Sequence, residues 1–222
     1  LEGKNYMEYF FNKFLRNCNS KKLCKILEYV VLNIPVFIED VFDTFIQYSD
    51  LLIDKFIFSN SNEVRKYGSS LFYKFILIGE EYPQIKSNRL ESIRTSLFIL
   101  YQSMIKRLDI LQQRIISKAN YPQISYSTML SELPVEHYFS LLTQIVNSCN
   151  LSSTISAQSE IFAKFLVETS YSFYRFNEPC FVRKFVLDFI IETMDNKDLN
   201  AFFGVNGEIL QIFMKGLPFF SQ

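Results

Sequence analysis

Residues that could carry a reaction are few in this chain, and their spacing argues against a complete active site. The only histidine, His137, follows Glu136 at the start of an expected helix, and Cys149 lies twelve residues further along. On a continuous helix these side chains would stand about 18 Å apart at 1.5 Å per residue, which is too far for a cysteine–histidine pair. We therefore predict no catalytic residue and interpret His137 as an ordinary surface or half-buried side chain.

Metal and phosphate sites are not predicted either. The four cysteines, Cys18, Cys24, Cys149 and Cys180, form no C-x-x-C pair, and a zinc site needs three or four ligands. The six glycines form neither G-x-G-x-x-G nor G-x-x-x-x-G-K-[ST], the common patterns that bind phosphate. The sequence thus predicts no metal ligand, no cofactor-binding residue and no cofactor.

Charge and hydropathy narrow the class of partner. Lys+Arg and Asp+Glu both number 23, so the formal net charge is zero, and the basic stripe typical of nucleic-acid binders is not evident. The small cluster of Lys21, Lys22 and Lys25 is interpreted as the solvated face of a helix. No run approaches the roughly 18 consecutive apolar residues of a membrane span. We expect protein partners, no nucleic acid and no membrane span.

Cysteine usage and the first residues of the chain suggest where the protein works. Unpaired cysteines are typical of a reducing compartment, and no signal peptide is visible. We therefore predict an intracellular location, either cytoplasmic or nuclear. The chain opens on Leu1 instead of methionine, so it is expected to be a fragment of a larger protein.

Apolar residues recur at steps of three and four along most of the chain, which is the spacing of amphipathic helices. The longest stripe predicts one helix from about Asn88 to Ile116, either as the inner face of a packed array or as a coiled-coil seam. Pro122 and Pro134 mark residues 119–134 as a candidate hinge. No segment alternates with a period of two, so the predicted fold class is all-α. Further helices are predicted near 6–18, 23–31, 35–46, 51–58, 64–78, 135–146, 161–173, 182–194, 199–203 and 207–214.

Two of these helices begin alike, which favours a repeat architecture. Val-Arg-Lys followed by an aromatic residue occurs at 64–67 and again at 182–185, 118 positions later. That separation equals three units of about 39 residues, near the period of HEAT and armadillo repeats. We predict antiparallel helical hairpins stacked as an irregular HEAT/armadillo-like array that forms a single domain over 1–222. A compact bundle of irregular helices is the alternative.

The first of these helix starts also has the residues that a HEAT helix would need. Val64 and Leu71 would face the core, and Gly68 would let a neighbouring helix approach closely. Arg65 could form hydrogen bonds along the groove between repeats.

Two segments resemble a known family. Residues 52–65, Leu-Ile-Asp-Lys-Phe-Ile-Phe-Ser-Asn-Ser-Asn-Glu-Val-Arg, followed by Leu71 and Phe75-Ile76, are similar to a helical segment of the very large ubiquitin-specific proteases of the fat-facets type, on the C-terminal side of the peptidase domain. Residues 137–142, His-Tyr-Phe-Ser-Leu-Leu, resemble the family's Tyr-Phe-Asn-Leu-Phe helix, in the same order. Ser59-Asn60 stands where the family has Cys-Pro. The resemblance implies that the parent is a cysteine protease that removes ubiquitin, whose catalytic Cys and His boxes lie outside this chain.

The sequence therefore predicts a non-catalytic α-helical scaffold or protein-interaction segment of a large deubiquitinating enzyme, a ubiquitin carboxyl-terminal hydrolase. The resemblance implies that its partners are its own peptidase domain, substrates or adaptors. The alternative is a HEAT-like scaffold of an unrelated trafficking, transport or chromatin protein. No binding residue is predicted, because a neutral net charge gives no hint of the partner's sign.

Overall fold

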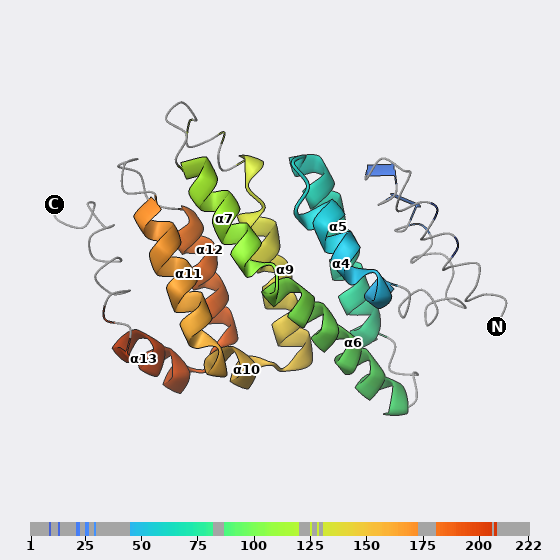
Figure 1. The fold of residues 1–222 in the computed structure, drawn as a ribbon. Coiled ribbons are helices and arrows are strands. Elements are labelled where there is room, and N and C mark those ends of the chain that lie inside the picture. The colour runs from blue at the N-terminus through green and yellow to red at the C-terminus, as the bar shows by residue number, and fades with distance from the viewer. Residues whose placement is uncertain are drawn as a thin grey trace. The chain divides into compact units, whose positions relative to one another are not determined.

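The computed structural model describes residues 9, 13, 21–22, 25–26, 29, 45–81, 87–119, 125, 128, 131–172, 181–205 and 207. The regular elements of these residues are all helices, which confirms the all-α prediction for this part of the chain (Figure 1). The chain divides into two compact units, Leu1–Ile105 and Lys106–Gln222, and each is described by itself. The prediction of one domain with a hinge at 119–134 stays a prediction, since most of 120–130 lies outside the described residues.

Four consecutive helical elements make up the described body of the first unit. They are α4 (Ser49–Leu52), the π-helical turn η2 (Ile53–Ile57), α5 (Asn62–Glu81) and α6 (Ser87–Ile105). In η2 the Phe58 amide donates to the Ile53 carbonyl, five residues earlier, at 3.0 Å. This wider turn buries Ile53, Phe56 and Ile57 together, whereas the sequence predicted an ordinary helix over 51–58.

Helix α5 packs against η2 through the residues that the sequence singled out. Val64 and Leu71 are buried. A Cβ atom built on Gly68 would lie 2.4 Å from the Cβ of Phe56, far inside the contact distance of about 3.5–4.0 Å between carbon atoms. The prediction that Gly68 permits the close approach of a neighbouring helix is therefore confirmed.

Aromatic rings and a buried polar contact complete the first core. Phe45 lies against Phe75 with ring centroids 3.8 Å apart and meets the edge of Phe72 at 4.9 Å. Between α4 and α6 the hydroxyl groups of Ser49 and Ser103 lie 3.5 Å apart, so these buried oxygens face each other instead of hydrocarbon.

The buried phenol of Tyr101 in α6 is expected to make this unit less stable at alkaline pH. It is 1% exposed, and burial raises its pKa from 10.0 to about 12. Between these values the unfolded chain loses the phenolic proton and the folded chain keeps it, so stability falls as pH rises from 10 towards 12. Urea unfolding at pH 9, 10, 11 and 12 should show a steeper decline for the wild type than for Tyr101→Phe. Tyr73→Phe, at an exposed site, is the control that should keep the wild-type slope.

The long stripe between residues 88 and 116 forms two helices, so the prediction of one continuous helix is wrong. α6 ends at Ile105, and α7 (Leu108–Ala119) begins after a turn at residues 106–107. The charges suit this break, because Lys106 and Arg107 follow the negative end of α6 and Asp109 lies in the first turn of α7. The described stripe residues are buried within the chain, which favours packed helices over a coiled-coil seam; they are Leu97, Leu100, Met104, Leu108, Leu111 and Ile115.

The second unit starts with α7 and continues with α9 (Val135–Cys149), α10 (Ser152–Ala157), α11 (Ser159–Ser172), α12 (Phe181–Thr193) and α13 (Asn196–Val205). The sequence predicts a break over residues 150–153, and the structure confirms it for 150–151, because α10 already begins at Ser152. Asn150 has left-handed backbone angles, with φ at 53°, and the Leu151 amide donates to the Val146 carbonyl at 3.0 Å. Asparagine tolerates this conformation better than most residues, so it ends α9 at little cost.

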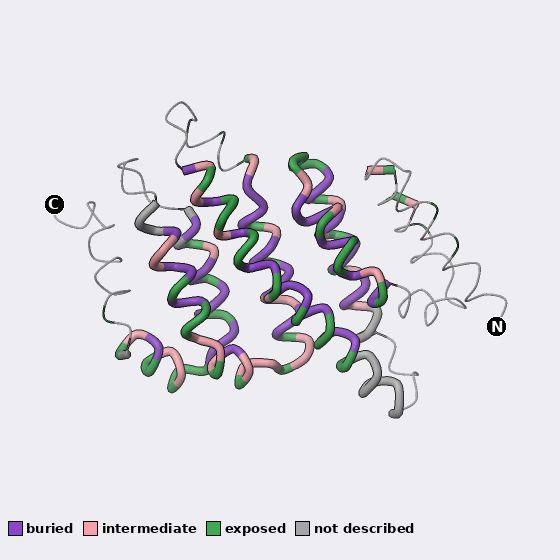
Figure 2. The backbone as a smooth tube through the Cα atoms, in the orientation of Figure 1, coloured by how far each residue is buried: buried purple, intermediate pink, exposed green. Residues whose placement is uncertain are grey.

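Helices that are distant in sequence pack side by side in this unit. α7 contacts α11 and α9 contacts α12, and the consecutive helices α11 and α12 also contact each other (Figure 1). Buried residues recur along each of these helices (Figure 2). At their centre Phe139 lies 5.6 Å from Phe165 and 5.7 Å from Phe189, and Phe189 lies 5.0 Å from Phe162, measured between ring centroids.

Several predicted helices and caps fall on residues that the structure does not describe. They are the bulk of 6–18, 23–31, 35–46 and 207–214. The sequence also predicts an N-cap and first turn at Asn177-Glu178-Pro179, and these residues too lie outside the described part of the chain.

Candidate functional site

The two side chains considered for catalysis stand at opposite ends of one helix. His137 lies in the first turn of α9 and is half-buried, and Cys149 is its half-buried last residue. They are thus separated by nearly the full length of a continuous helix, as the sequence predicted. Cys18, Cys24 and Cys180 lie outside the described residues.

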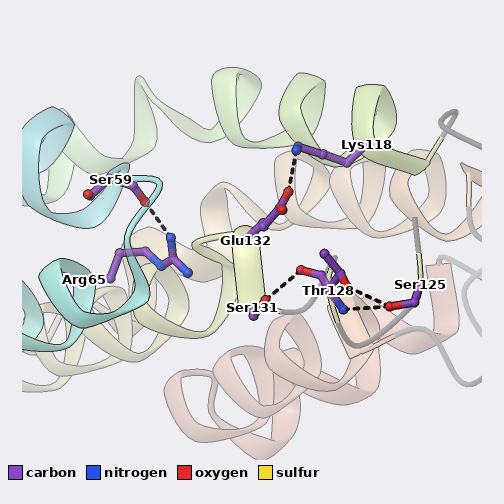
Figure 3. A network of polar contacts seen from close by, with 7 residues as sticks. All are labelled: Ser59, Arg65, Lys118, Ser125, Thr128, Ser131 and Glu132. Atoms are coloured by element: carbon purple, nitrogen blue, oxygen red, sulfur yellow. Dashed lines mark hydrogen bonds and ion pairs between the residues drawn. The ribbon is translucent and has the colours of Figure 1, made fainter. Parts of the chain in front are cut away.

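Arg65, a candidate for bonding along a groove, has a structural role within the first unit. It is 1% exposed, and its Nη1 donates to the Ser59 carbonyl at 2.5 Å (Figure 3). This bond ties the start of α5 to the loop that follows η2.

Polar contacts also organise the segment that leads into α9 (Figure 3). The Ser125 hydroxyl accepts the Thr128 amide at 3.2 Å, and the Ser131 hydroxyl donates to the Thr128 carbonyl at 2.8 Å. Lys118 pairs with Glu132, so the end of α7 is joined to the residues just before α9.

Two lysines of the small basic cluster, Lys21 and Lys25, lie against α5. Lys21 forms an ion pair with Glu63. The Nζ atoms of Lys21 and Lys25 each lie 5.8 Å from the ring centre of Tyr67. The hydrogen bond to Glu63 raises the pKa of Lys21. These charges are therefore engaged with α5, beyond the solvated face that the sequence predicted.

A pocket of about 300 Å³ opens between α9 and α12 in the second unit. From α9 it is lined by Glu136, Phe139, Ser140, Thr143 and Gln144. From α12 it is lined by Phe185, Asp188, Phe189 and Glu192. Each set recurs at three- and four-residue steps, so it occupies a single face of its helix. The volume is at the lower end of the range for ligand pockets, about 300–1,000 Å³.

The lining divides into an aromatic floor and an acidic rim. Phe139 and Phe189 are each 1% exposed, and Phe185 is half-buried beside them. Glu136 and Asp188 are exposed, as is Glu192. These three carboxylates are the charged residues among the described members of the lining, and none of those described members is a lysine or an arginine.

Two neighbouring side chains that the structure describes do not line the pocket. Lys184 precedes Asp188 on α12, and His137 follows Glu136 on α9; neither of them belongs to the lining. The described part of the lining therefore carries a local negative charge although the chain as a whole is neutral.

The acidic residues of α12 are placed against the preferences of the helix. Asp188 and Glu192 are four residues apart, and like charges at this spacing destabilise a helix by about 0.2–0.5 kcal/mol. Glu192 also lies in the last turn, next to the negative end of the helix dipole. Glu136, by contrast, lies in the first turn of α9, where a negative charge stabilises the helix. Asp188 also lies four residues after the exposed Lys184, a spacing at which opposite charges stabilise a helix. Local helix stability thus explains Glu136 and favours Asp188 in part, but it does not explain Glu192.

Charge reversal at these two sites should change stability in opposite directions. We expect Glu192→Lys to raise the free energy of unfolding by roughly 0.5–1 kcal/mol, because it removes a like-charge pair and suits the helix end. Glu136→Lys should lower it by about 0.3–1 kcal/mol. Urea titrations at low ionic strength measure both. If both variants changed the free energy of unfolding by the same amount and in the same direction, the helix dipole and the pairing of neighbouring charges would not determine the stability effects of residues 136 and 192.

Sequence reasoning assigned none of the lining residues to a pocket, although Glu136, Phe139 and Ser140 belong to segments that it discussed. Their juxtaposition depends on the packing of α9 against α12, whose facing residues are about fifty positions apart in the chain. One feature of the sequence could have pointed to the pocket. Asp188 and Glu192 are like charges four residues apart, and Glu192 lies near the end of a helix, where a negative charge is unfavourable. Residues that do not stabilise their own helix are candidates for a functional role.

Two searches for other kinds of site gave no candidate in the described part of the chain. No three of its His, Cys, Asp and Glu residues are grouped so that they could hold a metal ion. None of its helices combines the length and apolar character needed to cross a membrane. Compared with known proteins, the chain matches no family model, no curated protein and no solved structure.

Proposed function

We propose that this chain is a non-catalytic helical scaffold that binds protein, and that the face formed by α9 and α12 is a contact surface. The observation that carries the proposal is the pocket between these two neighbouring helices, with buried rings at its base and exposed carboxylates at its rim. Interfaces between proteins commonly combine an apolar centre with a polar rim.

A HEAT/armadillo-like stacking of hairpins is part of this proposal. In such a stack, α7 and α9 would form one hairpin, and α11 and α12 would form the next. The first helix of each hairpin would then contact the first helix of the other, and the second helix would contact the second. The contacts of α7 with α11 and of α9 with α12 follow this pattern. The burial of Val64 and Val182 at the two similar helix starts is consistent with a repeated unit.

We propose further that the parent protein is a deubiquitinating enzyme of the fat-facets type. Support comes from the two sequence matches. The first, 52–65, covers η2 and the start of α5, and the second, 137–142, lies within α9. The departure at Ser59-Asn60 favours the second candidate, a helical scaffold of an unrelated trafficking, transport or chromatin protein.

The coding sequence of the whole protein distinguishes the two candidates. A ubiquitin-protease Cys box a few hundred residues upstream, with the matching His box, supports a deubiquitinase parent. An open reading frame with no peptidase boxes supports the unrelated scaffold.

Cross-linking of the whole protein in cells, followed by mass spectrometry, tests the scaffold itself. We expect intermolecular cross-links from α9 and α12 to other proteins, and these links should be reproducible between preparations. If the chain shows intramolecular links alone, the proposal of a protein-binding scaffold is wrong.

A further inference from the structure

We propose that the pocket between α9 and α12 docks a basic segment of a partner protein, with lysine or arginine side chains placed among Glu136, Asp188 and Glu192. This inference rests on the proposed function, because it names the chemistry of the scaffold's partner.

Charge complementarity is the first argument. Among the lining residues that the structure describes, the charged ones are three exposed carboxylates and none is a cation. A complementary basic segment would be steered towards this surface and favoured over acidic partners. Guanidinium groups suit such a site particularly well, because they bind carboxylates with two parallel hydrogen bonds.

The aromatic base of the pocket is the second argument. Phe185 is half-buried and adjoins the fully buried Phe139 and Phe189. A cation near the face of an aromatic ring gains an electrostatic attraction. The aliphatic stem of a lysine or arginine can also cover apolar surface while its charged end reaches the rim. A long basic side chain therefore matches both parts of the lining.

The extent of the polar face favours a peptide segment over a single small cation. Glu136 and Gln144 both line the pocket, and they are separated by about 12 Å along α9 at 1.5 Å per residue. A segment with two or more basic side chains can engage carboxylates on both helices, whereas one small amine reaches a part of this length. The three carboxylates are not grouped as a metal site.

The unfavourable placement of Glu192 is an independent reason to infer a cationic partner. Two like charges at i and i+4 repel each other, and Glu192 is also repelled by the helix end. A bound cation would relieve both effects at once. The arrangement thus destabilises the free helix and stabilises the complex. Residues that oppose the local preferences of a helix are common at functional sites.

Fluorescence anisotropy with defined probes tests the proposal on the 222-residue chain. The first probe is a fluorescein-labelled ten-residue peptide in which two arginines and two lysines are spaced by glycine and serine. The second has glutamine in place of the four basic residues. Unlabelled arginine amide, added as a competitor, represents a small cation. Titrations at low and at physiological salt measure the electrostatic part of binding, which screening weakens.

Two variants and one matched control locate the binding. Glu136→Gln combined with Asp188→Asn and Glu192→Gln removes the three pocket charges. Asp54→Asn combined with Asp109→Asn and Glu160→Gln removes three exposed charges outside the lining. Ser140→Lys keeps every carboxylate and adds a cation to the pocket, so it guards against an effect of misfolding. Circular dichroism confirms that each protein is folded.

We expect the basic peptide to bind the wild type and the control alike, and at least tenfold more weakly to the pocket triple variant and to Ser140→Lys. Equal binding to the pocket and control variants would overturn the inference, as would equal binding of the glutamine peptide. Arginine amide that competes as strongly as the unlabelled basic peptide would overturn it in favour of a small cation. If the peptide fails to bind while cellular cross-links to proteins persist, the inference fails and the scaffold proposal stands.

Discussion

Replacing Phe139 with alanine is expected to lower the free energy of unfolding of the second unit by about 3–5 kcal/mol. Phe139 is 1% exposed and its ring contacts those of Tyr138, Phe165 and Phe189. Truncation removes the buried ring and leaves a cavity that the surrounding helices can fill only partly. Because whole domains are stable by only about 5–15 kcal/mol, the loss should be evident in a urea titration monitored by circular dichroism.

Ile191→Ala in the neighbouring helix α12 is the control for Phe139→Ala. Ile191 is 56% exposed, so its truncation should change the free energy of unfolding by less than about 0.5 kcal/mol. Similar losses for the two variants would mean that the aromatic cluster is not the stabilising core of this unit.

A side chain at position 68 should destabilise the first unit, although alanine is the better helix former. Gly68→Ala gains about 1 kcal/mol of helix propensity over glycine. The new Cβ, however, would meet the Phe56 Cβ at 2.4 Å and its Cα at 3.3 Å. The Cβ and Cα positions are fixed by the backbone, so no rotamer of Phe56 relieves the clash and η2 must move away from α5. We expect a net loss of about 1–3 kcal/mol for alanine, and more for leucine.

Gly204 provides the matched control, because it also lies in a helix but has no atom within 4 Å of a built Cβ. Gly204→Ala should raise the free energy of unfolding by up to about 1 kcal/mol, as propensity alone dictates. Thermal and urea unfolding of the two alanine variants measure this difference in sign. If Gly68→Ala were as stable as wild type, the close packing of α5 on η2 would be wrong.

The helices were predictable from sequence because each carries its own apolar stripe. The starts of α5 and α9 and the end of α9 follow from residues that favour turns, namely Asn60-Ser61-Asn62, Pro134 and Asn150. The predicted break at 150–153 was two residues too long, because α10 begins at Ser152. Gly68 was also predictable as a close approach, since a lone small residue in an apolar stripe leaves room for a neighbour. These features depend on residues that are near one another in the chain.

The features that the sequence did not predict depend on finer geometry or on distant contacts. The turn at 106–107 contains neither glycine nor proline, and the apolar stripe continues across it, so periodicity alone predicts an unbroken helix. The pocket requires Glu136 to lie beside Asp188 and Glu192. Amphipathic stripes show which face of a helix is buried but not which other helix covers it, and a net charge of zero conceals a local excess of one sign.

The π-helical turn at Ile53–Ile57 has a consequence for how this region can vary in length. With the Phe58 amide bonded to the Ile53 carbonyl, the turn holds one residue more than an α-helical turn would. Such a turn can arise when a single codon is inserted into a helix, since the extra residue is absorbed locally and both flanks stay helical. A relative that lacks one residue here should therefore have an unbroken α-helix in place of the π-helical turn. It should still place an aromatic side chain, the counterpart of Phe56, opposite the counterpart of Gly68.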